Sequence, residues 1–454
     1  MLEVHIGLDD SDDFAWGCTT NLLREIVREI WRSPLANKIV FIDYPLLTRL
    51  NPAIPHKTRG NGAVSLHIRV SSEDVVREIR DLILQLIDPE RRLSGREPGA
   101  IILQDTMSFE LAKFLYEKTL TDYTTLDLVY RVLDKTKSQA IVRGRGLIGS
   151  LASIAHHFIE NDCTYELIGY TIRSSDLFIS PARVYEMDRE TYPHTFNNID
   201  EETRKILLTP SIGRPVSIGI RGESPRVLLK AFNIIRPEGI DEILIFRSNQ
   251  GTDQHLIPRK LSDARVYQSG LFEGFIARDP EIHVGGDVFI ELREESDPNA
   301  SVRVAFYKEF KEGNIVARRL RRGDRVLVGG TVKPLASSDG AREYIINAEY
   351  LKILSLARVL REENPKCPRC GHTMKSLGVG KGFKCPKCGY RDRSARKILV
   401  EIARDSSILN RVFKPPPRNM KHLTKPLQRF GLEKICKRNI HRVIDIGEFY
   451  KIIK

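Results

Sequence analysis

Apolar and polar positions follow two different spacings in the first 140 residues. Short runs of β-branched and other apolar residues are typical of strands, and the segments between them repeat apolar residues at intervals of three and four, as amphipathic helices do. This spacing predicts helices over residues 18–30 and 75–87. Strands that alternate with helices indicate an α/β domain over residues 1–140. The predicted strands are residues 3–10, 39–47, 63–70 and 100–105.

A second pattern begins near residue 141, where a glycine-rich turn leads into an apolar helical stretch. Strand-like and helical segments then alternate as far as residue 265. This alternation is typical of a ferredoxin-like α+β domain, which we expect over residues 141–265. The turn at residues 221–224 joins a strand to a helix, a position where ligands often bind.

Between residues 266 and 358 the pattern becomes purely strand-like. Five short apolar runs are separated by glycine-containing turns, and no long helical segment interrupts them. We expect a small β-barrel of the OB type over residues 266–358, although on the pattern alone any other small barrel fits equally well. Five arginines between residues 318 and 325 favour RNA as the ligand of this barrel.

Four of the seven cysteines form two Cys-x-x-Cys-Gly pairs, separated by fourteen residues. Four thiolates at this spacing can close a tetrahedron around Zn²⁺, so we expect a structural zinc ribbon over residues 359–395, with unmetallated cysteines as the alternative. The other three cysteines are isolated in the sequence. The cysteine pattern as a whole indicates metal binding in a reducing compartment and not a disulfide framework. The expected zinc ligands are Cys367, Cys370, Cys385 and Cys388.

The C-terminal segment is strongly basic. From residue 391 to the end there are 17 lysines and arginines against six acidic residues, while the whole chain has a net charge of +13. This asymmetry indicates a polyanionic partner, usually nucleic acid, although a solvated basic tail is the alternative. Apolar residues recur within this segment, so we expect a basic helical extension over residues 396–454.

Chain length and hydropathy limit the classes of protein to which this sequence can belong. A chain of 454 residues exceeds the size of a single hydrophobic core, so several domains are expected. No apolar run approaches the roughly 20 residues that a membrane span needs, and the first residues resemble a strand rather than a signal or transit peptide. We therefore expect a cytoplasmic protein with no membrane partner.

Four aspartates follow the first predicted strand, at the carboxyl end where α/β domains place their ligands. Their charges repel one another unless a cation neutralises them, and Mg²⁺ bound to phosphate oxygens is a natural partner of such carboxylates. Thr19 and Thr20 follow at the start of a predicted helix, whose amide groups favour anions. The alternative is structural, with turn residues and a threonine N-cap. The aspartates are Asp9, Asp10, Asp12 and Asp13.

Two glycine-rich stretches are further candidates for phosphate binding. The first begins at Lys57 and contains Arg59, so it combines two cations with a flexible turn before a strand. The second, residues 143–150, enters a predicted helix, and Gly144 and Gly146 would let the backbone approach phosphates closely. No Gly-Lys-Ser/Thr sequence follows, so a turn or a helix-packing role is the alternative for the second stretch.

Five motifs follow one another along the chain: GLDDSD, GCTT, NPAIPHKTRGNGAV, GRGLIGSLASI and GIRGES. Together with the barrel and the cysteine ribbon, they resemble the archaeal tRNA(Ile)2 2-agmatinylcytidine synthetase family, over the chain to about residue 393. The resemblance implies a kinase-like α/β domain that binds ATP, a ferredoxin-like domain, an OB fold and a zinc ribbon. In that family, ATP activates the 2-oxo group of the wobble cytidine of an isoleucine tRNA with a CAU anticodon, and agmatine replaces it.

The resemblance also implies roles for single residues. Asp9, Asp10 and Asp12 would hold Mg²⁺ and the phosphates of ATP, and Ser11 stands among them where the family usually has threonine. Thr19 matches a threonine that becomes phosphorylated. A second motif implies three more residues near the nucleotide. They are Arg59, Gly60 and Asn61.

The implied chemistry requires two further features. Agmatine carries a guanidinium and an amine, so its pocket needs carboxylates, for which Glu223 and Asp253 are our candidates; a surface or capping role suits either equally well. The wobble base must leave the anticodon stack to expose its 2-position. The barrel, the ribbon and the basic extension would hold the tRNA.

Two other functions remain compatible with these patterns. One is a non-catalytic tRNA- or single-stranded-DNA-binding protein built on the barrel and the ribbon, which leaves the N-terminal aspartates unexplained. The other is a different nucleotide-dependent enzyme, such as an RNA ligase. ATP turnover measured with and without tRNA and agmatine distinguishes the three.

Overall fold

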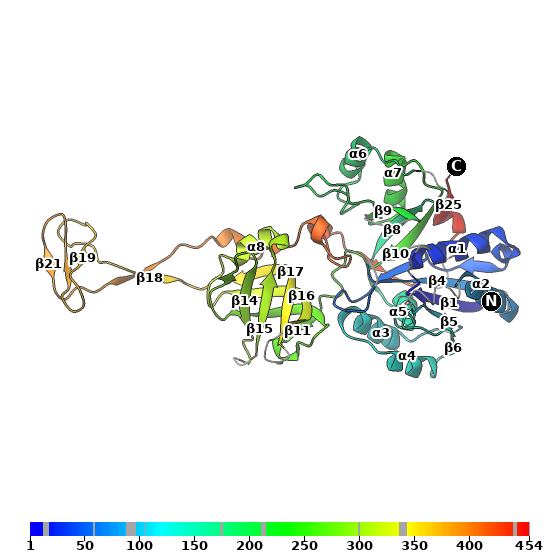
Figure 1. Ribbon diagram of the computed structural model, residues 1–454, viewed down its shortest axis with the longest axis horizontal. Helices are drawn as coiled ribbons and strands as arrows, with labels where there is room; N and C mark the ends of the chain where they lie inside the picture. Colours follow the sequence, from blue (N-terminus) through cyan, green and yellow to red (C-terminus); the bar gives the residue numbers. More distant parts are fainter. Residues whose placement is uncertain are drawn as a thin grey trace.

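The structure is a computed structural model, in which an α/β body, a β-barrel and a small cysteine-containing unit follow one another along the long axis. Figure 1 shows the body at one end, with both termini in it, the barrel in the middle and the cysteine unit at the far end. The residues that the structure describes are 1–11, 18–57, 60–87, 97–104, 106–172, 176–209, 215–297, 300–335, 343–438 and 443–453.

A ten-stranded sheet forms the centre of the α/β body. Its strands are β1 (Leu2–Asp9), β2 (Ile39–Phe41), β3 (Leu46–Arg49), β4 (Gly62–Val70), β5 (Gly99–Leu103), β6 (Ser138–Val142), β8 (Thr164–Tyr170), β9 (Val216–Gly222), β10 (Glu242–Ser248) and β25 (Tyr450–Ile452). The order is β6-β5-β1-β4-β3-β10-β8-β9, with β2 added on β4 and β25 on β10. Among these described strands, β3 and β10 run parallel and the other pairs are antiparallel.

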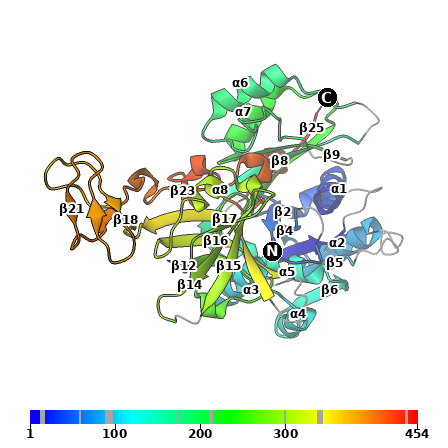
Figure 2. The ribbon, with the colours of Figure 1, turned by 60° about the vertical axis from the view of Figure 1, so that its left-hand side comes forward.

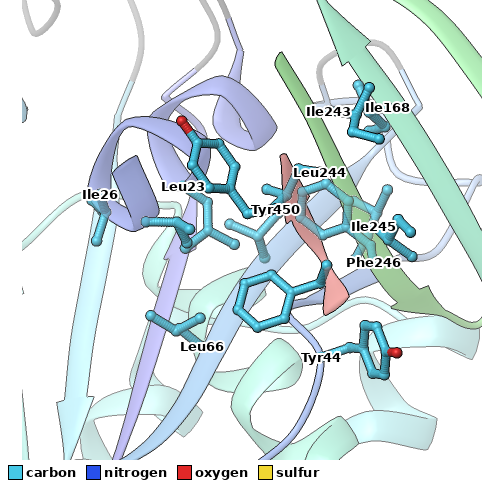
Figure 3. Packing of buried hydrophobic residues seen from close by; sticks show 14 of the residues in the cluster. Leu23, Ile26, Tyr44, Leu66, Ile168, Ile243, Leu244, Ile245, Phe246 and Tyr450 are labelled. Carbon is cyan, nitrogen blue, oxygen red and sulfur yellow. The ribbon is translucent and has the colours of Figure 1, made fainter. Parts of the chain in front are cut away.

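The two domains that the sequence predicts before residue 265 therefore share one sheet. Arg247 and Ser248 of β10 pair with Leu46 and Leu47 of β3. One hydrophobic cluster continues across this junction, from the first helix to β10 and β25. Figure 3 shows Leu23, Tyr450, Leu244 and Phe246 among the side chains gathered in this cluster.

Helices cover both faces of the N-terminal part of the sheet. On one face lie α1 (Thr19–Arg32) and α2 (Glu73–Leu86), and on the other α3 (Phe109–Thr121), α4 (Leu126–Leu133) and α5 (Leu147–His157). Successive side chains of a strand point to opposite faces, so β1 buries alternate apolar residues such as Val4 and Ile6 against α1, while Gly7 faces α5. The helices predicted at 18–30 and 75–87 are confirmed within two residues.

The second part of the sheet carries α6 (Pro181–Thr191) and α7 (Pro225–Ile235), which pack on each other. The predicted alternation of strands and helices is confirmed here. Helix α5, which follows the expected boundary at residue 141, packs on β1, β4 and β5 of the preceding part.

The predicted barrel is a closed all-β unit with its own hydrophobic core. Its strands are β11 (Pro258–Arg259), β12 (Ser269–Ile276), β13 (Glu281–Ile282), β14 (Val288–Arg293), β15 (Ser301–Phe306), β16 (Arg325–Leu335) and β17 (Glu343–Ser355). They follow the order β11-β12-β16-β17-β15-β14-β13, and an additional pairing of β12 with β14 closes the barrel. Short helix α8 (Glu312–Ala317) packs on β14 and β15. Phe272, Phe306 and Val328 are fully buried in its centre.

The cysteine unit is joined to the barrel by two paired strands, β18 (Leu360–Glu363) and β22 (Ile398–Glu401). Three short strands, β19 (Lys375–Ser376), β20 (Phe383–Lys384) and β21 (Arg391–Asp392), form its small sheet. Figure 1 shows this unit projecting beyond the barrel.

The prediction of a helical C-terminal extension is wrong. The described residues of segment 396–454 contain no α-helix, and four short strands add to other parts of the molecule: β22 on β18, β23 (Val412–Phe413) on β17, β24 (Ile435–Cys436) on β7 (Asn161–Asp162), and β25 on β10. Prolines at 415–417 and 426 explain the difference, because proline removes an amide donor and breaks a helix. The extension runs from the barrel back to the sheet (Figures 1 and 2).

A disulfide joins two of the cysteines that are isolated in the sequence. Cys163 and Cys436 are bonded across a sequence separation of 273 residues. Cys163 directly follows β7 and Cys436 is the last residue of β24, so the pairing of these strands brings the two together. The cysteine pattern, which indicates a metal site in a reducing compartment and not a disulfide framework, does not predict this bond.

None of the described helices combines the length and the apolar character that a membrane crossing requires.

Candidate functional site

A cavity of about 250 Å³ opens at the carboxyl end of β1. It lies among the end of β1, the loop after β3, the segment between α3 and α4, and the start of α5. The predicted residues Asp9, Asp10, Lys57, Asn61 and Gly146 all line it. Segments that are distant in the sequence thus bring the first acidic motif and both glycine-rich stretches to one place.

Asp9 and Asp10 occupy the position that the strand-end argument predicts. Oδ1 of Asp9 accepts a hydrogen bond from the amide of Asp10 (2.7 Å), and Oδ2 of Asp10 accepts one from the amide of Glu97 (3.1 Å). Asp10 has a φ of 54°, which turns the chain sharply after the strand. Both side chains are partly exposed and can reach a cation in the cavity.

Ser11 and Thr19 lie together beneath this turn. The Ser11 hydroxyl is 3.3 Å from Oγ1 of Thr19, and both side chains are almost completely buried. Thr19 is the first residue of α1, after Cys18 as N-cap. Neither Ser11 nor Thr19 is among the described residues that line the cavity. The predicted site residues Asp12 and Arg59, and also Asp13, lie outside the described residues.

The second motif contributes another part of the cavity wall. The side-chain amide of Asn61 donates to the carbonyl of Asn51 (2.8 Å), and the amide of Leu50 donates to the carbonyl of Asn61 (2.8 Å). These bonds hold the ends of the loop that carries Lys57. Burial and the nearby Lys421 ammonium lower the pKa of Lys57. Gly60 has a φ of 72°, and a Cβ there would meet the Arg49 guanidinium at 2.7 Å.

The glycine-rich stretch before α5 makes close contacts with protein backbone. A Cβ on Gly144 would lie 2.3 Å from the carbonyl group of Glu97, and a Cβ on Gly146 would lie 2.4 Å from the carbonyl oxygen of Asp9. Close packing against the neighbouring backbone is therefore one reason why positions 144 and 146 are glycines. Gly146 also lines the cavity, where the N-terminus of the eleven-residue helix α5 favours an anion.

Sequence reasoning missed a third wall of the cavity. The segment from Thr119 to Leu126 contributes Asp122 and Tyr123. Apolar side chains of Leu50, Ile54 and Ile148 complete a surface suited to an aromatic ring. These residues belong to turns and helix ends with no distinctive motif, so nothing in the sequence singles them out.

The two candidate carboxylates for agmatine already have cationic partners from the C-terminal extension. Arg429, which is fully buried, donates to both carboxylate oxygens of Glu223 and also to Asp162 at 3.1 Å. Lys414 donates to Asp253. Neither Glu223 nor Asp253 is among the described residues lining the cavity. Their role toward agmatine stays a prediction.

The four predicted zinc ligands form a compact group in the cysteine unit. The sulfur of Cys367 is 3.5 Å from that of Cys388, and the sulfur of Cys370 is 3.4 Å from that of Cys385. All four sulfurs lie within 4.8 Å of one another. A tetrahedral Zn²⁺ with bonds of about 2.3 Å fits this spacing and these soft donors.

Comparison with known proteins shows which family the chain resembles. Three family models match the chain: the TiaS TCKD domain at residues 5–80, the TiaS FLD domain at residues 144–255 and the TiaS C-terminal zinc ribbon domain at residues 364–405. The tRNA(Ile)2 2-agmatinylcytidine synthetase TiaS of Staphylothermus marinus is 39% identical over 450 residues, covering 95% of this chain and 94% of that protein. The enzyme of the same name from Ignisphaera aggregans is 37% identical over 448 residues, covering 95% and 94%.

Solved structures give the same result over almost the whole length of the chain. The complex of TiaS with tRNA(Ile)2 and ATP has a TM-score of 0.78 and 33% identity, covering 94% of this chain and 98% of that one. The complex of TiaS with tRNA(Ile)2, AMPCPP and agmatine has a TM-score of 0.76 and 30% identity, with the same coverage. A ZRD-deleted mutant of TiaS in complex with agmatine has a TM-score of 0.66 and 27% identity, covering 94% and 97%.

Proposed function

The chain belongs to the tRNA(Ile)2 2-agmatinylcytidine synthetase family, and from this membership and its cavity we propose how it carries out the reaction. The enzyme uses ATP to form agmatidine in the isoleucine tRNA that this family modifies. The purely RNA-binding alternative is not favoured, because the chain matches synthetases along almost its entire length.

The cavity at the end of β1 is the proposed site of the ATP phosphates. Asp9 and Asp10 provide carboxylates on one side, and Lys57 and Arg145 provide cations nearby. The N-terminus of α5 adds amide groups that favour an anion. Leu50, Ile54 and Tyr123 would accept the adenine ring. This combination of opposite charges with an apolar wall is the observation that carries the proposal.

The donor set of Asp9 and Asp10 fits Mg²⁺, a hard cation usually held by one or two carboxylates together with phosphate oxygens. Bound there, Mg²⁺ would neutralise charge on the transferred phosphoryl group. Lys57 would stabilise the same charge from another part of the cavity wall, and Asp12 and Arg59 would contribute from the two motifs.

The reaction proceeds in two displacements. The 2-oxo oxygen of the wobble cytidine would attack a phosphorus of ATP while the bond from that phosphorus to its leaving oxygen breaks, so that the base carries the phosphate and the remaining nucleotide leaves. The amine of agmatine then attacks C2 of the base, and phosphate leaves with the activated oxygen. The attacking amine must lose a proton, so a base is needed next to it. Carboxylates of the second part of the sheet, with Glu223 and Asp253 as our candidates, would recognise agmatine.

Thr19 is proposed as a phosphorylated residue of the kinase-like domain. Its buried hydroxyl contacts Ser11, so the packing around Thr19 must change before phosphate reaches it. Mass spectrometry of peptides containing Thr19 after incubation with ATP tests this role. An unmodified peptide contradicts it.

The remaining domains are proposed to bind the RNA. We assign residues 1–140 to a kinase-like domain, 141–265 to a ferredoxin-like domain, 266–358 to an OB fold and 359–395 to the zinc ribbon. The exposed ribbon and the basic residues of segment 396–454 would contact phosphates, so binding should weaken steeply with salt.

A direct experiment tests the function. An isoleucine tRNA transcript with a CAU anticodon is incubated with the enzyme, ATP and agmatine, digested, and analysed by mass spectrometry. Agmatidine at the wobble position is expected, and omission of agmatine or ATP should prevent its formation. A methionine tRNA with the same anticodon is the specificity control. Absence of agmatidine in the complete reaction would refute the proposal.

A further inference from the structure

Three lysines from distant parts of the chain converge beside the nucleotide cavity. Lys57 belongs to the loop after β3, Lys333 to β16 of the barrel, and Lys421 to the C-terminal extension. The sequence alone gives no sign that these residues meet. Only Lys57 of the three lines the cavity itself, so the other two lie at its barrel side.

Hydrogen bonds fix the positions of Lys333 and Lys421, the two lysines that the sequence analysis does not identify. The ammonium of Lys333 donates to the carbonyl of Ala53, four residues before Lys57. The ammonium of Lys421 donates to Oγ1 of Thr331 (3.2 Å) and to Oε1 of Glu349 (3.2 Å). Thr331 and Lys333 are two residues apart on β16, so their side chains leave the same face of the strand.

The three lysines have too few carboxylates around them. Burial, and next the charge of Lys421, lowers the pKa of both Lys57 and Lys333; Lys57 adds to the effect on Lys333. Among the described residues, Glu349 is the one carboxylate in an ion pair with any of the three, and it also binds His255 and Thr424. Lys57 has no hydrogen-bond or ion-pair partner within the described part of the chain. A surplus of positive charge remains.

The positive region continues beside His422, where Arg49 and Arg221 lie. A Cβ on Gly60 would lie 3.0 Å from Nε2 of this histidine. The Arg49 guanidinium, burial and the Arg221 guanidinium hold the pKa of His422 well below its usual range, so the ring is neutral near pH 7. Arg49 and Arg221 share a single carboxylate, Glu166.

A phosphate group suits this arrangement. Three ammonium groups around a partly desolvated site repel one another, and an anion between them replaces repulsion with charge-assisted hydrogen bonds. A purely structural network would be expected to balance these charges with acidic side chains, as Glu166 does for Arg49. The site is also accessible, because Lys57 is exposed and the other two side chains are partly exposed.

We propose that Lys57, Lys333 and Lys421 bind a backbone phosphate of the substrate RNA next to the nucleotide that is modified. This inference rests on the proposed function. RNA is favoured over the phosphates of ATP because Lys333 and Lys421 come from the barrel and the extension, the parts proposed to hold RNA. A phosphate held at this mouth would fix the sugar of the neighbouring nucleotide and direct its base into the cavity.

Lys333→Gln and Lys421→Gln test the proposal without altering Lys57, a candidate residue of the phosphoryl-transfer site. The affinity for the tRNA transcript is measured as a function of salt. One lost phosphate contact should reduce the slope of log K against log salt by about 0.7 to 0.9 and weaken binding at low salt. Lys333→Arg should keep the wild-type slope. Lys135→Gln, which removes an exposed charge after α4, is the matched control.

Three outcomes would overturn the proposal. The slopes of both glutamine variants could equal that of Lys135→Gln, which would exclude a phosphate contact. The affinity for ATP without RNA could fall while the RNA slope stays unchanged, which would assign the lysines to ATP. The variants could also lose RNA binding together with their thermal transition, with Lys333→Arg equally affected, which would make the lysines structural. Agmatidine formation by the wild-type enzyme is assayed in parallel, so that failure of the function itself is recognised separately.

Discussion

The carboxylate of Asp9 rests directly against Gly149 of α5. A Cβ on Gly149 would lie 2.0 Å from Oδ2 of Asp9, closer than any normal contact. The helix therefore determines where this carboxylate lies in the cavity, and it can do so only because residue 149 has no side chain.

Replacing Gly149 with alanine should move the Asp9 carboxylate and lower agmatidine formation at least about a hundredfold, since misplacing a reacting group by about 1 Å has effects of this size. Alanine favours a helix by up to about 1 kcal/mol over glycine, so a large loss of thermal stability is not expected. Activity and melting temperature are measured together. Gly285→Ala, at a position with open space, is the control, and normal activity of Gly149→Ala would contradict the role of Asp9.

Asp9→Asn and Asp10→Asn should each abolish base modification and leave tRNA binding intact. Asparagine keeps the shape of the side chain and removes the charge that would hold Mg²⁺. Product formation is followed by mass spectrometry and tRNA retention by filter binding, with exposed Asp134→Asn as the control. Near-normal product from either variant would disprove the metal assignment.

Replacing Cys367 and Cys370 with serine should release zinc and weaken tRNA binding while preserving agmatine binding. The ribbon projects away from the α/β body, so its collapse should leave the cavity unchanged (Figure 1). Zinc is measured by elemental analysis and agmatine binding by calorimetry. An unchanged zinc content would contradict the ligand assignment.

Acidification should destabilise the α/β body through its buried histidines. Burial holds the pKa values of His67, His156 and His157 well below the usual range. The unfolded chain therefore binds protons that the folded chain does not, and stability present above about pH 6.5 is lost as the pH falls. The expected slope is about 1.4 kcal/mol per pH unit for each histidine.

Several charged and titratable groups surround these rings: His5, Asp43, Arg247 and Arg438. Denaturant titrations between about pH 7.5 and 5 measure the effect, a range that brackets the ordinary histidine pKa. His67→Gln should reduce the pH dependence, and exposed His283→Gln should not change it. Equal slopes for wild type and His67→Gln would argue against this origin.

The Cys163–Cys436 disulfide should stabilise the attachment of the C-terminal extension. A cross-link that closes a loop of this length restricts the unfolded chain, and disulfides typically contribute about 2 to 4 kcal/mol. Cys436→Ser should lower the melting temperature, and reductant should then have no further effect. Thiol titration of the denatured, metal-free chain should find five thiols among seven cysteines. Seven would disprove the bond.

Local patterns in the sequence were sufficient to predict much of the fold and the position of some candidate site residues. Asp9 and Asp10 follow a clear strand, and the end of a strand in an α/β domain is a common ligand position. The zinc ligands are recognised by the Cys-x-x-Cys spacing within each pair, so Cys367 and Cys370 could be identified without a structure. These signals are short-range, and the structure places the residues as expected.

Features that depend on distant segments could not be predicted in this way. The pairing of Cys163 with Cys436 and of Glu223 with Arg429 requires the extension to return to the sheet. The helical prediction for the extension failed because prolines interrupt the segment. Apolar residues that suggested helical spacing, such as Ile398 and Leu399, lie exposed on the short strand β22. Asp122 reaches the cavity from a turn that has no motif.

The parallel pairing of β3 with β10 has a mechanical consequence for catalysis. Backbone hydrogen bonds and a common core weld the two parts of the α/β body into one stiff platform, so a hinge between them would have to break the sheet. We therefore expect adaptation to an incoming RNA to come from outside this sheet, above all from the cysteine unit, which projects beyond the barrel.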